Sequence, residues 1–208
     1  MMTASGWFPA IGNKMKQWIV SDDTVPENTP FWIDGNALVH YDGTASKVMV
    51  PETVTAISED AFSNNSSVCR VLIPDSVRKI GSDTFRSCSK LRSVRLPQKL
   101  SVLESGLFEC CHMLQAIQIP RGIREIGDRA FFGCTQLNAL SLPKSLEKIA
   151  PDAFLDCPDL VLYIPAGTYA AKFARKHGLV CRVIPRRDNH SIKWNFNSFR
   201  KKQESKLQ

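Results

Sequence analysis

The sequence predicts a repeat solenoid built mainly from short β-strands and turns. Five phenylalanines and five prolines each recur at a constant step of 23 residues: Phe62, Phe85, Phe108, Phe131 and Phe154, and Pro51, Pro74, Pro97, Pro120 and Pro143. A fixed period of about 20 to 29 residues is typical of solenoids. One turn of such a fold cannot bury its own apolar face, so it must stack on its neighbours.

The first 46 residues predict two segments that precede the repeats. Over 1–30, apolar residues recur at three- and four-residue steps, which indicates an amphipathic helix followed by a polar connection. We expect this helix to pack against the first turns, with a partner-binding or interfacial helix as the alternative. Over 31–46, the turn dipeptides Asp34-Gly35 and Asp42-Gly43 predict a hairpin that caps the open end of the solenoid.

The five repeats span 47–161, and the third shows how each turn is built. Arg95 lies between two apolar residues in Val94–Leu96, which predicts a short strand with its flanking side chains inward and Arg95 outward. Leu100 and Leu103 predict a second extended segment on another face of the coil. Phe108 then fills the interior, and its equivalents predict a continuous aromatic stack.

The repeat resembles the BspA-like leucine-rich repeat pattern, LxxIxLPxxLxxIgxxAFxxCxxL, over residues 47 to 165. Departures are few: Thr84 and Leu107 replace the small residue before phenylalanine, and Asn65 stands where later turns carry cysteine. The resemblance implies a right-handed, curved solenoid. It also implies relatives that include adhesins and surface proteins.

Four of the seven cysteines follow the repeat, and we interpret them as a ladder of buried, reduced thiols. They are Cys88, Cys111, Cys134 and Cys157. Disulfides and a zinc site are the alternatives, but the chain has no CxxC pair. The other three, Cys69, Cys110 and Cys181, are the better candidates for exposed thiols, and the odd total favours a reducing compartment.

No catalytic set follows from the sequence. The histidines, His40, His112, His177 and His190, have no repeated acid or nucleophile beside them, and no glycine-rich phosphate loop is present. We therefore expect a protein that is not an enzyme, with no cofactor and no metal.

Residues 162–184 predict a C-terminal cap of strand, short helix and strand, which also resembles the family's C-terminal cap. The strand begins as a sixth turn, one residue short of the register, and a last strand is expected over 180–184. We expect Thr168 to cap the helix start, Tyr169, Phe173 and the aliphatic part of Lys176 to form its packed face, and Gly178 to end it.

The basic character of the chain is confined to its C-terminal part. The formal net charge is +7, of which residues 172–208 contribute +9 and residues 1–171 contribute −2. Within the tail, 185–208, basic and aromatic residues are mixed, which favours an arm packed on the solenoid's end, with nucleic acid or an anionic membrane as alternative partners. The candidate polyanion contacts are Arg186, Arg187, Lys193, Trp194, Arg200, Lys201 and Lys202.

An extended surface is therefore the main functional feature, and we predict a non-enzymatic scaffold, monomeric, that binds a protein partner. The outward residue of each first strand gives the candidate partner row Met49, Leu72, Arg95, Gln118, Ser141 and Tyr163. The alternatives are a cell-surface adhesin or host-binding fragment, and tail-mediated binding of polyanions. The start lacks the apolar core of a secretory signal, so we expect a cytoplasmic protein, with a surface location as the alternative that the resemblance implies.

Overall fold

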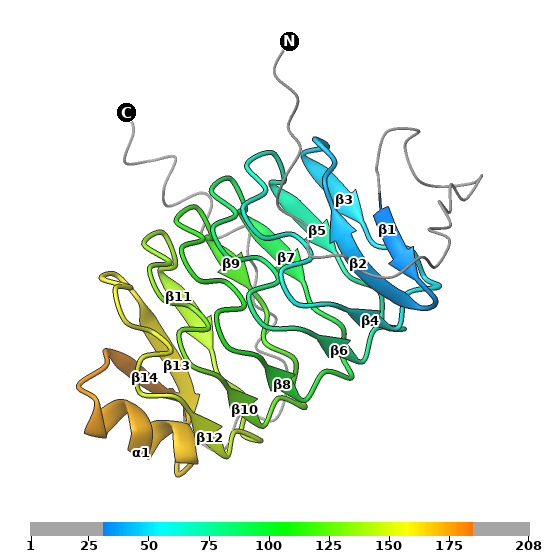
Figure 1. Ribbon diagram of the computed structural model, residues 1–208. Coiled ribbons are helices and arrows are strands. Elements are labelled where there is room, and N and C mark those ends of the chain that lie inside the picture. The colour runs from blue at the N-terminus through cyan, green and yellow to red at the C-terminus, as the bar shows by residue number, and fades with distance from the viewer. Residues whose placement is uncertain (1–30, 185–208) are drawn as a thin grey trace.

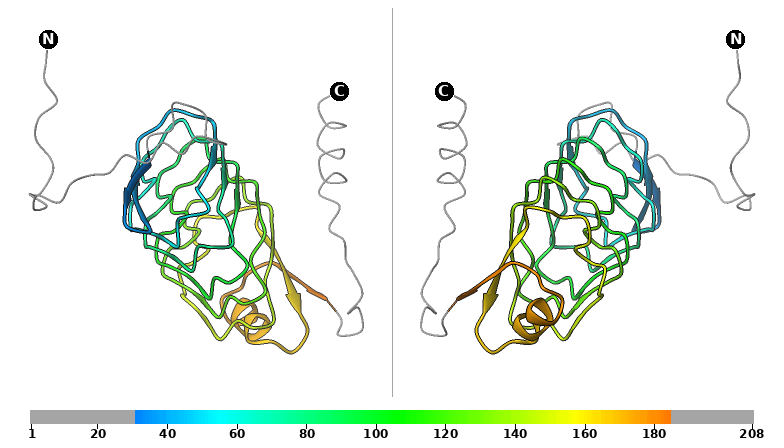
Figure 2. Two further views of the ribbon diagram at one scale, coloured as in Figure 1. Left: turned by 90° about the vertical axis from the view of Figure 1, so that its right-hand side faces the viewer. Right: turned by 90° about the vertical axis from the view of Figure 1, so that its left-hand side faces the viewer.

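The predicted solenoid is confirmed. The computed structural model describes residues 31–184 as a mainly-β coil with a single helix (Figure 1). Viewed from its ends, the coil is a tube of stacked turns with the helix at one end (Figure 2). Successive turns pair in parallel, because each repeat offers the same backbone groups at the same height.

Two of the walls of the tube are formed by strands. The first strand of each repeat lies before its proline, and these strands together with the two strands at the C-terminal end form what we call the first-strand face: β3 (Lys47–Met49), β5 (Arg70–Leu72), β7 (Ser93–Arg95), β9 (Ala116–Ile117), β11 (Ala139–Ser141), β13 (Val161–Pro165) and β14 (Cys181–Ile184). The second strand of each repeat contributes to the second-strand face: β4 (Ala56–Ile57), β6 (Lys79–Ile80), β8 (Val102–Leu103), β10 (Glu125–Ile126) and β12 (Lys148–Ile149).

Each wall is divided into two hydrogen-bonded sheets, and the divisions fall at different turns. The first-strand face consists of β3-β5-β7-β9 and β11-β13-β14, whereas the second-strand face consists of β4-β6, continued from the N-terminal hairpin, and β8-β10-β12. β9 and β11 remain neighbours without forming a described ladder.

The first repeat is preceded by a hairpin. β1 (Phe31–Asp34) pairs antiparallel with β2 (Ala37–Tyr41), and Gly35 turns the chain between them with a φ of +56°. β2 then pairs in parallel with β4, so it takes the place of a second strand in an additional, shorter turn. Whether the hairpin protects the end of the solenoid against association, as a cap would, stays a prediction.

A stack of aromatic rings fills the coil. Neighbouring phenylalanines of the repeats have ring centroids 5.1, 5.5, 5.4 and 5.7 Å apart. The hairpin extends the stack, because Tyr41 lies 5.0 Å from Phe62 and Phe31 lies 5.2 Å from Tyr41. The predicted aromatic core is thus confirmed and is longer than the repeats.

The cysteine ladder bonds one turn to the previous one. The thiol of Cys88 donates to the carbonyl oxygen of Phe62 at 3.0 Å, and the same bond recurs at Cys111, Cys134 and Cys157 with the phenylalanine 26 residues earlier. Each thiol thereby donates a hydrogen bond to a buried carbonyl group. A side chain without a donor would leave this carbonyl with one hydrogen-bond partner fewer. Asn65, which replaces the first cysteine, donates to the Gly43 carbonyl and accepts from the amides of Ser67 and Val68.

The corners around Phe62, Phe85, Phe108 and Phe131 use left-handed backbone at two positions, and the corner around Phe154 uses it at one. Two residues before and two residues after the phenylalanine, φ is positive at Asp60, Asp83, Gly106 and Arg129, and at Asn64, Ser87, Cys110, Gly133 and Asp156. Glycine, asparagine and aspartate adopt this conformation at the least cost. Ser87, Cys110 and Arg129 do so against their intrinsic preference, which the repeat pattern does not predict.

The helix α1 (Tyr169–Lys176) corrects two predictions at the C-terminal end. Its packed residues are Ala170, Phe173 and Ala174, whereas Tyr169 is 40% exposed and Lys176 is exposed. Small alanines allow the helix axis to approach the coil closely, so the packed face is centred away from Tyr169. Thr168 occupies the N-cap position, but its hydroxyl donates to the Pro165 carbonyl at 2.8 Å and caps no helical N–H.

Candidate functional site

The first-strand face presents the predicted partner row as two aligned groups. Backbone register places Met49 beside Leu72 and Leu72 beside Arg95, and it places Ser141 beside Tyr163. Gln118 follows Ile117, which is opposite Val94, and so continues the first group. Because no ladder joins β9 to β11 in the described part of the chain, the row is divided between Gln118 and Ser141.

The exposure of this row is uneven. Met49 is 49% exposed and the Arg95 side chain is 55% exposed, whereas Leu72 and Tyr163 are half-buried. Tyr163 is opposite Arg182 of β14 in the backbone register. The face therefore combines apolar and basic side chains. This composition suits a protein partner whose own surface combines apolar and charged groups.

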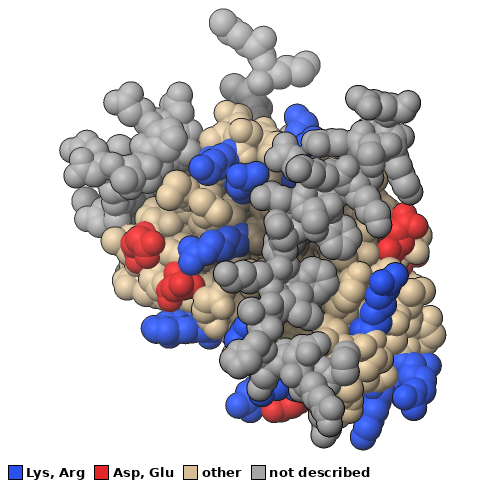
Figure 3. Space-filling view, turned by 180° about the vertical axis from the view of Figure 1, so that it is seen from behind, with Lys and Arg blue, Asp and Glu red and all other residues tan. Residues whose placement is uncertain are grey.

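The strands of the first-strand face contain basic residues but no acidic ones. Lys47 and Arg70 are opposite each other on β3 and β5, Arg95 lies on β7, and Arg182 lies on β14. In the view from behind, lysine and arginine side chains are spread over the visible surface of the solenoid, with aspartate and glutamate side chains among them (Figure 3). The basic character predicted from the sequence was that of the tail, because the net charge of the whole chain lies there, and this smaller excess on the strands was missed.

A small cavity opens on this face. It has a volume of about 240 Å³, and three residues of the predicted row, Leu72, Arg95 and Gln118, line it. The rest of its lining is Arg70, Ser93, Val94, Leu96 and Gln98. Arginine, serine and glutamine side chains provide hydrogen-bond donors, and the aliphatic residues form its floor.

One wall of the cavity is held by an ion pair. The Arg95 guanidinium contacts the Asp75 carboxylate at 3.3 Å, and the other oxygen of this carboxylate accepts the backbone N–H of Gln98 at 2.9 Å. Asp75 thus links the turns that carry β5 and β7. The contact is exposed, so its effect is to orient Arg95 and not to stabilise the fold substantially.

A larger cavity, of about 680 Å³, lies between the last corner and the helical end. It is lined by Thr135, Pro151, Phe154, Leu155, Asp156, Cys157, Pro158, His177 and Leu179. It exists because α1 covers the last turn incompletely: Leu155 is 55% exposed and Cys157 is only half-buried. This corrects the prediction that Cys157 is buried like the other three thiols of its ladder.

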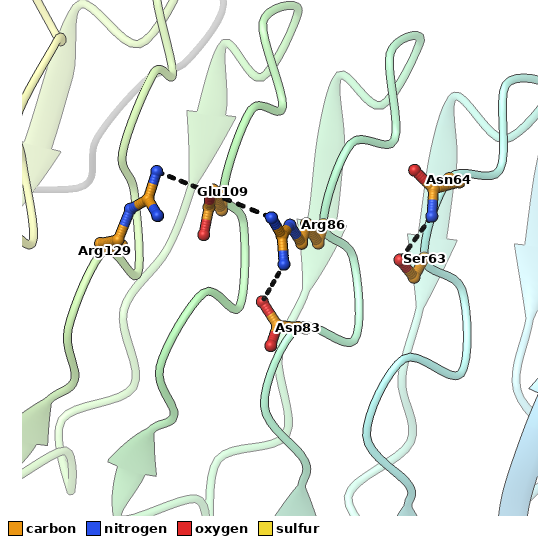
Figure 4. Close-up of polar contacts among 6 residues, drawn as sticks. All are labelled: Ser63, Asn64, Asp83, Arg86, Glu109 and Arg129. Carbon is orange, nitrogen blue, oxygen red and sulfur yellow. Dashed lines mark hydrogen bonds and ion pairs between the residues drawn. The ribbon is translucent and has the colours of Figure 1, made fainter.

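A charged network occupies the corners of the middle turns. Glu109 is 5% exposed and contacts Arg129 at 2.8 Å and Arg86 at 3.7 Å, while Arg86 also contacts Asp83 at 3.8 Å (Figure 4). The Arg129 guanidinium lies 4.3 Å above the ring of Phe132. These side chains neutralise one another across three turns, and they explain why a carboxylate can be buried at Glu109.

The four cysteines of the ladder have the chemistry of structural thiols. All seven cysteines of the chain are free. Burial raises the pKa of the Cys88 thiol from its ordinary value of 9.0 to about 12 and that of Cys157 to about 11, and it also raises the pKa values of Cys111 and Cys134 well above the ordinary value. Thiolate is the nucleophile and the metal ligand, so these groups are unreactive at neutral pH.

Residues 31–184 contain no cluster of three or more side chains suited to hold a metal ion, and no helix within them has the length and apolar character to cross a membrane. His112 interacts through Nδ1 with the Gly133 carbonyl at 2.9 Å. The expected absence of an active site, a cofactor and a metal stays a prediction.

Two sets of predicted features lie outside the described residues. They are the amphipathic segment within 1–30 and the tail contacts Arg186, Arg187, Lys193, Trp194, Arg200, Lys201 and Lys202.

Comparison with solved structures identifies several leucine-rich repeat proteins. A leucine-rich cell surface protein from Faecalibacterium prausnitzii is 30% identical, with a TM-score of 0.63 over 70% of this chain and 40% of that chain. The leucine-rich repeat protein of T. pallidum is 24% identical, with a TM-score of 0.64 over 86% and 95% of the two chains. The pneumococcal vaccine antigen PcpA is 17% identical, with a TM-score of 0.60 over 76% and 48%. The last two likenesses concern the fold alone.

The chain spans about 40% of the length of the F. prausnitzii protein. A comparison with curated proteins finds no match. The family model for the BspA type leucine-rich repeat region matches residues 36–161 in six copies, one more than the five repeats of the sequence pattern. The additional copy begins in the region of the hairpin, where β2 pairs with β4 like a member of the coil. With this match over more than half of its length and with the stacked 23-residue turns of its structure, the chain belongs to the BspA-type leucine-rich repeat family.

Proposed function

We propose that the protein is a non-enzymatic scaffold that binds a protein partner through its first-strand face. The observation that carries this proposal is the exposed row on that face, where Met49, Leu72 and Arg95 are aligned by register and end at a cavity with Gln118. Repeat proteins use extended surfaces of this kind for binding. The raised thiol pKa values and the lack of a metal-binding cluster in 31–184 give no support to a catalytic role.

Site-specific photo-crosslinking in the source cells tests this proposal. A photoreactive residue is placed at Met49, Gln118 or Ser141, and at Lys79 and Glu147 as exposed controls outside the first-strand face. We expect a common adduct of one mass from at least two positions of the row and none from the controls. Equal adducts from both sets, or adducts from the controls alone, would contradict the choice of surface.

A cell-surface adhesin or host-binding fragment is the second candidate. It is supported by the 30% identity to a protein described as a leucine-rich cell surface protein. Protease treatment of intact source cells separates this role from a cytoplasmic scaffold. Loss of the full-length chain, with a cytoplasmic marker preserved, would favour the surface role, whereas complete protection would favour the interior.

A further inference from the structure

We propose that the 240 Å³ cavity of the first-strand face is a carboxylate site, which receives an aspartate or glutamate side chain from an acidic, partly apolar peptide segment of the partner. This inference rests on the proposed function and specifies the chemistry of the partner. It assigns the charge recognition to Arg70, with Arg95 and Ser93 as neighbouring donors.

The strands of the first-strand face carry a net positive charge. The seven strands of this face carry four basic residues and no acidic residue. On the second-strand face the charges are mixed, and Lys148 is paired with Glu125 at 2.5 Å. At the cavity Asp75 offsets Arg95, so Arg70 leaves a local excess of one positive charge, which favours an acidic partner over a basic one in both association rate and selectivity.

One of the two arginines that line the cavity has no ion-pair partner among residues 31–184. Arg95 is already paired with Asp75, whereas Arg70 is exposed and has no ion-pair partner within residues 31–184. Arg70 lies beside Ser93 in the register, and both line the cavity. A guanidinium matches a carboxylate through two parallel hydrogen bonds, and a serine hydroxyl can donate a further one.

The volume of the cavity limits the size of the group that it can hold. Ligand pockets for whole small molecules occupy about 300–1,000 Å³, and this cavity is smaller. Its volume suits one side chain of a peptide that continues along the face. Leu72 forms part of its lining, and Met49, exposed by 49%, lies beside Leu72 for contact with an apolar residue of the same peptide.

A peptide fits these features better than a nucleic acid or a sulfated polysaccharide. Nonspecific binding of a single-stranded nucleic acid combines a basic groove with aromatic side chains for stacking. No aromatic residue lines this cavity, and the basic residues of β3, β5 and β7 are interspersed with Met49 and Leu72. Binding to a nucleic acid or a polysaccharide is therefore an outcome that the test must separate.

The experiment titrates the full chain with a capped peptide that alternates leucine and glutamate, and with its counterpart in which glutamine replaces glutamate. Calorimetry gives the affinity, and NMR gives the location. We expect the glutamate peptide to bind with a dissociation constant of about 1 mM or below, and to shift the amide signals of Arg70, Leu72, Ser93 and Arg95. The glutamine peptide should bind about tenfold more weakly, because it loses the charge-assisted hydrogen bonds.

Matched variants assign the effect to the cavity. Arg70→Gln should weaken the glutamate peptide about tenfold. Arg78→Gln removes one exposed positive charge away from the cavity and should change the affinity less than about twofold, since an exposed charge of this kind contributes mainly through screened long-range attraction. Ser93→Glu places a carboxylate in the cavity and should abolish binding, which provides a second test if Arg70→Gln lowers the yield of folded protein.

The outcomes are distinct. Equal binding of the two peptides, or equal losses in the Arg70 and Arg78 variants, would overturn the proposal. Heparin or single-stranded DNA that binds more tightly than the peptide and shifts the same amides would also overturn it, in favour of a polyanion site. If the carboxylate site fails while photo-crosslinking from Met49, Gln118 and Ser141 persists, the scaffold function stands and only the chemistry of the partner is wrong.

Discussion

The phenylalanines of the first four repeats combine ring stacking with backbone pairing between turns. The Phe131 ring stacks between those of Phe108 and Phe154, its N–H donates to the Ala153 carbonyl at 2.9 Å, and its carbonyl accepts the thiol of Cys157. The repeat spacing predicts the ring stack. The thiol-to-carbonyl bonds are not readable from it, because a buried cysteine is equally expected as a small apolar residue.

Phe131→Ala should lower the free energy of unfolding by about 3–5 kcal/mol, because neighbours fixed in the stack cannot close the cavity that the ring leaves. Leu155→Ala, at a position that is 55% exposed, is the control and should cost less than about 1 kcal/mol. Chemical denaturation of both variants measures the difference. Similar losses would show that the phenylalanine stack does not dominate the core.

The buried thiols should make the stability depend on alkaline pH. Because folding raises the pKa of Cys88 from 9.0 to about 12, the folded state keeps this proton more tightly than the unfolded state. Its contribution to stability is complete below about pH 9 and is lost as the pH rises toward 12. Between pH 8 and 11, the free energy of unfolding should therefore fall more steeply with pH for the wild type than for Cys88→Ala. Chemical denaturation at each pH measures it, and equal slopes for the two proteins would contradict this role.

At the scale of the element, the spacing of the strands depends on glycine at particular turns. A Cβ atom on Gly81 would lie 2.4 Å from the backbone nitrogen of Glu59 in the previous turn, closer than atoms approach in folded proteins. The Gly81 N–H donates to the Ile57 carbonyl at 2.9 Å, so this close approach belongs to the ladder between β4 and β6. The sequence identifies Gly81 as a turn residue, but the contact across turns requires the stacked structure.

Gly81→Ala should destabilise the fold by about 1–3 kcal/mol, because the backbone of the neighbouring turn must move. Gly122→Ala is the matched control, since its Cβ would meet its nearest atom, the Leu100 oxygen, at an ordinary 3.4 Å. This control should leave the stability nearly unchanged or raise it slightly, because alanine reduces the conformational freedom of the unfolded chain. Thermal melting of the two variants distinguishes them, and an equal effect would show that the turns separate freely at Gly81.

At the scale of the whole molecule, the basic tail and the first-strand face make separate predictions. Removal of residues 185–208 takes away seven basic and two acidic residues, so the formal net charge falls from +7 to +2. We expect the truncated chain to keep the melting transition of the repeats and its peptide binding, and to lose salt-sensitive retention on heparin. Arg70→Gln should have the opposite pattern. Loss of peptide binding on truncation alone would place the functional element in the tail.

The sequence by itself determines the repeat length, the inward residues, the ring stack and the outward row, because each depends only on a constant step between equivalent residues. Tertiary structure decides what depends on the distance between turns: the interruption of the ladder between β9 and β11 in the described residues, the left-handed backbone at Ser87, Cys110 and Arg129, and the burial of Glu109 between two arginines. It also decides that Arg70 and Arg95 share a cavity while Asp75 holds only one of them. Periodicity specifies which residues are neighbours, whereas the packing of actual side chains specifies how closely they meet and which charges remain unpaired.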